Sequence, residues 1–188
     1  MATSRTELDT AKVVEFLSQM LAVEKGGVML YEKALEQLAD PDLRDQLEEF
    51  LEQTRRHVEL CEDMLEQAGG SGQEDSPAAQ AAEAKAKGLI SVDVPEEMAD
   101  FNNIENLVLA ETKDNWNWEM LAEVSKSIKD RELRSTISRA VREVSRQERK
   151  HVDWNTSTLS RLAREMLMQK AREAGEEEED TEEMEERM

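Results

Sequence analysis

Four long segments of this sequence carry apolar residues at intervals of three and four, and each is long enough to span a small domain. They cover residues 7–38, 41–67, 95–128 and 132–172. This spacing places apolar side chains on one face of an α-helix, so each segment is predicted to be an amphipathic helix. Short turns at Pro41 and Asp130 join the helices in pairs, which predicts two antiparallel helical hairpins.

Residues 69–95 separate the two hairpins and break the apolar pattern. They begin with two glycines and allow one short helix at 78–87. Extended chain spans about 3.3 Å per residue, so this connection can return along a helix about 39 Å long. The predicted fold is all-α: an antiparallel four-helix bundle of two helical hairpins with one long crossover between the second and third helices. We expect the first and third helices to run parallel to each other, and likewise the second and fourth.

The charge and composition of the chain exclude several kinds of partner. The formal net charge is −20, which argues against binding to nucleic acid or to an anionic membrane surface. The sequence has no apolar run of about 18 residues, so we expect no membrane span, and its first residues lack the apolar region of a signal peptide. Cys61 is the single cysteine, which excludes an internal disulfide. We therefore expect a cytoplasmic protein in a reducing compartment.

Much of the negative charge is concentrated at the C-terminal end. Residues 176–188 contain nine acids and one arginine, which together contribute −8. Such runs of like charge are typically solvated and unstructured. We therefore divide the chain into a four-helix bundle, residues 1–172, and an acidic disordered tail, residues 173–188.

The two hairpins repeat each other in sequence. Residues 53–60 (QTRRHVEL) align with residues 147–154 (QERKHVDW), and each stretch contains one of the two histidines of the chain. In the other helix of each hairpin, the aligned pairs are Glu24 with Glu111 and Tyr31 with Trp118. Matches in all four helices, in the same order, indicate a duplicated helical hairpin. We interpret the tryptophans as packing residues.

Five ionisable side chains lie within the apolar stripes and are predicted to point into the bundle: Glu24, His57, Glu111, Glu148 and His151. Each of the four helices carries one of these side chains about 15 to 17 residues from its predicted start. At 1.5 Å per residue, the four side chains therefore lie at about the same height along the bundle. Buried carboxylates at one level repel each other unless a cation lies between them. Carboxylate and imidazole ligands together suit iron or manganese. The sequence therefore predicts a metal site inside the bundle.

This constellation resembles the ferritin-like superfamily, and most closely its rubrerythrin-like and bacterioferritin-like di-iron carboxylate bundles. Those proteins place one Glu on each of two helices and a Glu-x-x-His element on each of the other two. Here Glu148-Arg149-Lys150-His151 fits that element, while Glu24 and Glu111 fit the single glutamates. The second element is degenerate, because Thr54 stands where an acid is expected before His57. The resemblance covers roughly residues 8–165.

The resemblance implies a centre that holds two iron ions, with manganese as the other candidate. The three glutamates would balance the metal charge, and each histidine would fix one ion. The implied reaction is of the ferroxidase or peroxidase type with O2 or H2O2, in iron or oxidative-stress handling. The tyrosine seven residues after Glu24 resembles the family's site-adjacent tyrosine and would donate a hydrogen bond or an electron. The implied catalytic residues are Glu24, Glu111, Glu148 and Tyr31.

Two alternatives to this oxidoreductase remain open. Thr54 can weaken one metal site, which would leave a metal-binding or storage module with little turnover. The inward Glu and His residues can also pair with each other without metal and fix the helix register, as in a metal-free helical interaction domain. A homodimer or a larger homo-oligomer is compatible with all three functions.

Two further features lie next to the predicted ligands. Gly26 and Gly27 follow Glu24, and glycine costs about 1 kcal/mol relative to alanine inside a helix. They mark either a close helix contact or an opening for O2, peroxide or Fe2+. Asp114 and Asn115 lie one turn beyond the glutamate of the third helix, from where they can assist it.

Overall fold

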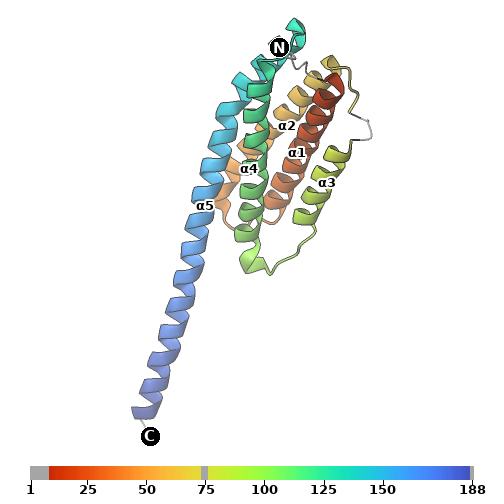
Figure 1. The fold of residues 1–188 in the computed structure, drawn as a ribbon. Helices are drawn as coiled ribbons and strands as arrows, with labels where there is room; N and C mark the ends of the chain where they lie inside the picture. Colours follow the sequence, from red (N-terminus) through yellow and green to blue (C-terminus); the bar gives the residue numbers. More distant parts are fainter. Residues whose placement is uncertain (1–8, 73–75, 187–188) are drawn as a thin grey trace, which may run out of the picture.

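The computed structural model describes residues 9–72 and 76–186 of the chain, with side chains described up to Met168. Within these residues the regular structure is entirely helical, which confirms the all-α prediction (Figure 1). The helices are α1 (Thr10–Glu36), α2 (Arg44–Gln67), α3 (Pro77–Ile90), α4 (Ala99–Ser125) and α5 (Arg131–Glu186), with 3-10 turns η1 (Pro41–Leu43) and η2 (Glu96–Met98) before α2 and α4.

Two helical hairpins form the bundle, α1 with α2 and α4 with α5 (Figure 1). The predicted direction of the third bundle helix was wrong: α4 runs antiparallel to α1. At one end of the bundle, the backbone N–H of Asp40, just before α2, donates to Asp100 at the start of α4 (2.8 Å). The crossover returns the chain along the whole bundle, so α4 starts where α2 starts. The two helices joined by the crossover therefore run parallel.

The crossover contains the short helix expected there, α3, which packs against α1 on the outside of the bundle (Figure 1). Both ends of α3 are attached to α1 by hydrogen bonds. At its start, the backbone N–H of Ala78 donates to Glu15 Oε1 (2.9 Å). At its end, Lys33 Nζ donates to the carbonyl oxygens of Ile90 (2.7 Å) and Val92 (2.9 Å). The crossover is thus a fifth element held against the bundle along most of its length.

The helix α5 extends past the other helices (Figure 1). Arg161 lies 3.2 Å from Asp40, which marks the end of the bundle, and α5 continues from there to Glu186. The helix had been expected to end near Arg172. Glutamate is a good helix former and no proline follows Arg172, so the helix continues past the one stop signal there, Gly175. The division of the chain into a bundle and an acidic disordered tail stays a prediction.

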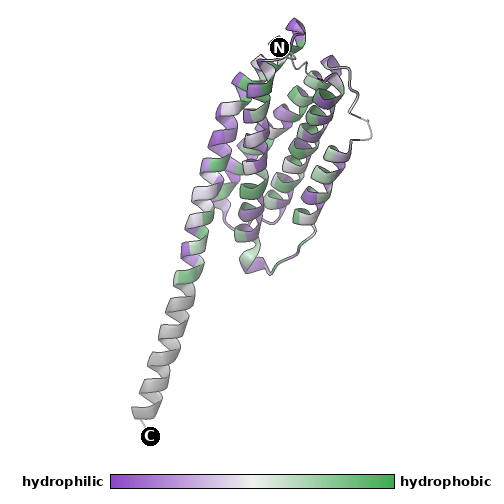
Figure 2. Cartoon of the chain, in the orientation of Figure 1, coloured by the Kyte–Doolittle hydropathy of each residue, from purple (hydrophilic) through white to green (hydrophobic). Residues whose placement is uncertain are grey.

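The apolar core has two parts, with a polar layer between them. One part lies towards the start of α1 and is built around Leu17, Met64 and Ile137. The other lies towards the end of α1 and is built around Leu47 and Leu107. Apolar and polar residues alternate along every bundle helix, as amphipathic packing requires (Figure 2). None of the described helices combines the length and apolarity that crossing a membrane would need.

A close helix contact explains Gly26. A Cβ atom built at this position would lie 2.8 Å from Ala86 Cβ on α3, and one built at Gly27 would lie 3.3 Å from Thr54 Cγ2 on α2. Real Cβ atoms almost never approach a neighbour as closely as the first of these distances. α3 can therefore come this close to α1 only because position 26 carries no side chain, whereas a side chain at position 27 would make a tight contact with α2.

We predict that Gly26→Ala lowers the free energy of unfolding by about 1–3 kcal/mol, because the new methyl group overpacks the contact with α3. The matched control is Gly88→Ala, where nothing lies within 4 Å of an added Cβ. That substitution should raise stability by up to about 1 kcal/mol through helix propensity alone. Urea unfolding of both variants measures the difference, and Ala86→Gly should restore the stability of Gly26→Ala. Equal effects of the two alanines would contradict the close contact.

Candidate metal centre

Two groups of buried side chains meet in the polar layer and share one residue. One group contains Glu24, His57 and Glu148, and the other contains Glu111, Glu148 and His151. Within each group, one potential ligand atom per residue lies within 4.8 Å of the others. All five side chains are buried, none more than 3% exposed. The structure thus brings the five predicted residues together, one or two from each of the four bundle helices.

In both histidines, the Nδ1 atom of the imidazole ring faces the carboxylates. His57 Nδ1 lies 3.1 Å from Glu148 Oε1 and 3.5 Å from Glu24 Oε2. His151 Nδ1 lies 3.2 Å from Glu111 Oε2 and 3.7 Å from Glu148 Oε1. The two rings are stacked with their centroids 5.8 Å apart. Glu148 therefore lies between two equivalent pairs of residues, Glu24 with His57 and Glu111 with His151.

Several of these atoms have no hydrogen-bond partner among the described residues, although they are fully buried. They are Glu24 Oε2, both carboxylate oxygens of Glu148, and His57 Nδ1. His57 Nδ1 and Glu148 Oε1 are close enough for a hydrogen bond, but they are not aligned for one. Buried polar atoms without partners are costly and uncommon. Convergent carboxylate and imidazole atoms of this kind fit a divalent cation between them, so the residues fit the metal centre that the resemblance implied.

The outward nitrogen of each histidine is held by a glutamine from the opposite hairpin. His57 Nε2 lies 2.9 Å from Gln147 Oε1, and His151 Nε2 lies 2.9 Å from Gln53 Oε1. An amide oxygen only accepts hydrogen bonds, so Nε2 carries the proton and Nδ1 of the neutral ring presents its lone pair to the centre. Both aligned stretches begin with glutamine, so the sequence carries the signal for this arrangement.

A second pair of contacts crosses between the hairpins in the same way. Trp118 Nε1 donates to Glu24 Oε1 (2.7 Å), and the hydroxyl of Tyr31 hydrogen-bonds to Glu111. These aromatic residues are the aligned pair of the sequence repeat. Trp118 was interpreted as a packing residue, and it is fully buried, but its indole N–H also orients a candidate ligand. Asn155 Nδ2 lies 3.4 Å from the Tyr31 hydroxyl on its other side.

The remaining side chains of interest lie beside the centre and outside both groups. Thr54 is buried, but its hydroxyl donates to the Phe50 carbonyl (2.9 Å) one turn earlier on its own helix. Asp114 is also buried, and its Oδ1 has no hydrogen-bond partner among the described residues. Burial, followed by the charges of neighbouring carboxylates, raises the pKa of Asp114 well above its usual range. Asn115 instead contacts the exposed Glu119 (3.4 Å) and does not reach the centre.

The centre holds protons in the absence of metal. Burial, and next the charge of Glu111, raises the pKa of Glu148 well above its usual range. Burial alone would lower the pKa of His57, but Glu24 and Glu148 outweigh it and raise that pKa well above 6.5. Burial likewise opposes ionisation of Glu111, but His151 outweighs it and lowers the pKa of Glu111. The imidazole of His57 therefore retains its proton to a higher pH than usual, and the shared carboxylate of Glu148 resists ionisation.

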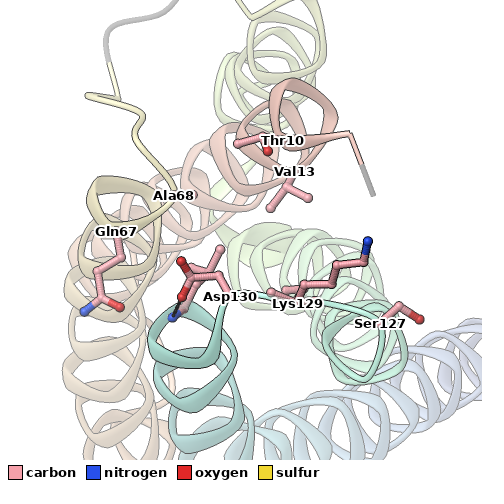
Figure 3. A pocket seen from close by; sticks show the side chains of 9 residues that line it. Thr10, Val13, Gln67, Ala68, Ser127, Lys129 and Asp130 are labelled. Atoms are coloured by element: carbon pink, nitrogen blue, oxygen red, sulfur yellow. Dashed lines mark hydrogen bonds between the residues drawn. The ribbon is translucent and has the colours of Figure 1, made fainter. Parts of the chain in front are cut away.

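A pocket elsewhere in the bundle lacks such ligands. It lies between the start of α1, the end of α2 and the α4–α5 turn and has a volume of about 350 Å³ (Figure 3). Its one described acidic side chain, Asp130, accepts from the backbone N–H groups of Glu132 (2.8 Å) and Leu133 (2.9 Å) and caps α5. The polar layer therefore remains the candidate functional site.

We predict that metal-free protein becomes less stable as the pH rises above about 6.5. The protonated ring of His57 stabilises the folded state fully below its ordinary pKa of 6.5, and this contribution is lost as the pH rises through the raised folded pKa. Glu148 acts in the same direction, since the folded state binds its proton more tightly than the unfolded chain does. Glu111, with a lowered pKa, matters only on the acid side.

Urea unfolding with a chelator present, at about pH 6 and about pH 8, measures this trend. Glu148→Gln removes one of the groups with a raised pKa, which also include His57 and Asp114, and should flatten the dependence. Stability that increases from the lower to the higher pH would show that the shared carboxylate does not retain its proton.

Comparison with known proteins places this geometry in a family. Residues 12–107, just over half of the chain, match the family model described as "Domain of unknown function (DUF892)". The match covers α1 to the first part of α4, so it includes Glu24 and His57 and ends before Glu111. No curated protein and no solved structure gives a significant match. The chain therefore belongs to the DUF892 family, which is related to the ferritin-like fold.

Proposed function

We propose that this protein binds two transition-metal ions, iron or manganese, in the polar layer of its bundle. The observation that carries this proposal is Glu148, a buried carboxylate shared by two groups of Glu and His, with both oxygens lacking a hydrogen-bond partner among the described residues. Each ion would have one histidine and one carboxylate of its own, and Glu148 would bridge them. Mixed imidazole and carboxylate ligands suit iron and manganese better than magnesium or calcium.

We further propose an oxidoreductase of the ferroxidase or peroxidase type, close in function to the rubrerythrin-like and bacterioferritin-like proteins. Two redox-active ions side by side supply one-electron chemistry towards O2 or H2O2. Glu24, Glu111 and Glu148 balance the ionic charge in a layer that has little access to water. Tyr31 orients Glu111 through its hydroxyl and would be the electron donor beside the centre. A cytoplasmic, reducing location, which the single cysteine favours, keeps iron in its ferrous form.

A small cavity offers a route for the oxidant. It has a volume of about 180 Å³ and lies between α1, α3 and α4, against Gly26 and Gly27. Ala110, next to Glu111, lines it on α4. The lining is mainly apolar, with Lys85 and Lys113 as its cationic side chains, and this suits a small neutral molecule such as O2 or H2O2. The glycines thus serve the close contact with α3 and also line this cavity.

The Thr54 position favours a second candidate function, metal binding with little turnover. The hydroxyl of Thr54 donates to a backbone carbonyl, so Glu148 would be the one bridging carboxylate among the described residues. Fewer bridging ligands would hold the two ions less rigidly. Oxygen uptake after adding Fe2+ distinguishes the two functions, because the storage protein binds the ion without consuming oxygen at an enzymatic rate. A protein that binds no transition metal would instead be the helical interaction domain.

We predict that wild-type protein binds two Fe2+ or Mn2+ ions per chain under anaerobic conditions. Glu148→Ala should lose both ions, because both groups use this carboxylate, whereas His151→Ala should lose one. Glu119→Ala, which removes an exposed acid from α4, is the matched control and should bind two. Isothermal titration and metal analysis after desalting measure the stoichiometry. Loss of a single ion in Glu148→Ala would show that Glu148 is not shared.

Metal binding should also stabilise the fold. At a free ion concentration of about 100 times Kd, the gain is about 2.7 kcal/mol per site. We expect melting temperatures to rise with Fe2+ or Mn2+ and to stay unchanged with Mg2+, which binds imidazole poorly. Equal rises with all three ions would indicate general screening of the acidic chain, and would count against a specific centre.

Thr54→Glu should complete the second Glu-x-x-His element. We predict that the metal-free variant is less stable than wild type, because a further buried carboxylate is repelled by the existing ones. With metal it should bind both ions more tightly, because it can act as a second bridge. Thr54→Gln, which is of similar size but carries no charge, is the control for packing against Gly27. Unchanged metal affinity in Thr54→Glu would mean that position 54 does not face the centre.

A further inference from the structure

The cavity between α1, α3 and α4 carries two cations and no acid among the described residues that line it. The cations are Lys85 of α3 and Lys113 of α4. Four other cavities of the described surface each have at least one acid in their lining: Asp130, Glu62, Glu123 and Glu32. A positively charged cavity is unexpected in a chain with 44 acids and 24 lysines and arginines. We call it the α3 cavity.

Lys113 and Asn117 form a group of hydrogen-bond donors beside the α3 cavity. The ammonium group of Lys113 donates to the amide oxygen of Asn117, which is a neutral acceptor. The amide nitrogen of Asn117 is fully buried and has no acceptor among the described residues. Burial lowers the pKa of Lys113, Asp114 opposes this shift, and the charge of Lys85 adds to it, so the two ammonium groups are close enough to repel each other. An anion between these donors would relieve the repulsion and accept the unused N–H.

The α3 cavity is polar at one end and apolar at the other. On α1, its lining begins at Gln19 and ends at Leu30, eleven positions later, which is about 16 Å of helix. On α4, which runs antiparallel to α1, the lining extends from Leu109 to Lys113, so Lys113 lies nearer to the Gln19 end. An elongated occupant would therefore have its polar atoms beside Gln19 and Lys113 and its apolar atoms beside Leu30 and Leu109.

An aliphatic carboxylate has the chemistry that both ends require. Its head group accepts hydrogen bonds from ammonium and amide N–H groups, and such charge-assisted bonds are stronger than neutral ones. Its hydrocarbon chain suits the apolar end. The cavity volume of about 180 Å³ is below the range of about 300–1,000 Å³ that is typical of sites for drug-sized ligands. A short unbranched chain therefore fits better than a nucleotide, a sterol or a peptide, and metal cations are repelled by the two lysines.

We propose that the α3 cavity binds a short aliphatic carboxylate, with its head group at Lys85 and Lys113 and its chain directed towards Leu30. The bound chain would occupy the space beside Gly26 and Gly27 through which the oxidant is proposed to reach the centre. Binding of the carboxylate therefore closes that route. The closure rests on the proposed function, whereas the binding itself does not.

Isothermal titration of the full-length protein with sodium octanoate tests the binding. The protein is kept metal-free with a chelator, so that the carboxylate cannot bind at the metal centre. We expect one site per chain, with an affinity that rises about fourfold for each methylene added between hexanoate and octanoate. Octan-1-ol has the same chain without the charge and should bind about tenfold more weakly. Absence of octanoate binding would overturn the proposal, and so would an alcohol that binds as tightly as the acid.

Substitutions in the lining separate the head group from the chain. Lys85→Gln combined with Lys113→Gln should weaken octanoate binding about tenfold and leave octan-1-ol binding unchanged. The matched control, Lys87→Gln combined with Lys126→Gln, removes one lysine from α3 and one from the end of α4, both outside the lining, and should bind octanoate like wild type. Ala110→Leu fills the apolar part and should weaken the binding of both ligands. Equal losses in the two lysine pairs would overturn the proposal, because the effect would then be one of net charge.

NMR with labelled alanine methyl groups locates the bound chain and does not depend on any substitution. Magnetisation transfer from octanoate should reach the methyl groups of the three alanines in the lining, Ala82, Ala86 and Ala110. Transfer that reaches alanines elsewhere in the bundle and none of these three would overturn the assignment of the site.

Oxygen uptake after adding Fe2+ tests the closure. Octanoate should slow uptake by wild type, and the variant without Lys85 and Lys113 should need about tenfold more octanoate for the same effect. Uptake that is not slowed when octanoate is bound would overturn the closure. Wild-type protein that consumes no oxygen would overturn the proposed function and the closure together, while the titrations of metal-free protein would still decide whether the carboxylate binds.

Discussion

The cost of burying carboxylates in a dry helical bundle determines most of this structure. Three glutamates and an aspartate lie in one layer between two apolar cores, where an isolated charge is far less stable than in water. Every neighbouring feature reduces that cost. Histidines face the carboxylates, an indole and a phenol donate to two of them, and some retain their protons. The oxygens of Glu148 that remain without donors among the described residues are those that a cation would satisfy.

The same layer explains why the sequence repeats. Each hairpin presents a Glu and a His to the centre, and each also provides the glutamine and the aromatic side chain that hold the other hairpin's ligands. The departures from this symmetry are local. Thr54 replaces a carboxylate, and Asp114 occupies the position that aligns with Gly27. One side of the layer is therefore acidic, and the other is closed by small residues.

The sequence predicted the helices and the five convergent side chains well, because helical periodicity identifies which residues share a face. It predicted helix direction poorly, since hydrophobic spacing is the same in both directions along a helix. The length of the crossover allowed the chain to return along the bundle, and a returning crossover places the start of α4 at the end where α2 starts. The contacts of Gln53 and Trp118 were missed for a different reason. Their partners lie on the other hairpin, and a pattern along one helix cannot show them.

Because the supporting contacts cross between the hairpins, the centre is an interface within one chain. Neither hairpin alone contains a histidine together with the glutamine that holds it. The matched family segment ends in α4 before Glu111, so it contains one side of this interface without the other. The crossover is attached to α1 at both of its ends. It therefore acts as a covalent tether, which keeps the two hairpins at a high effective concentration relative to each other.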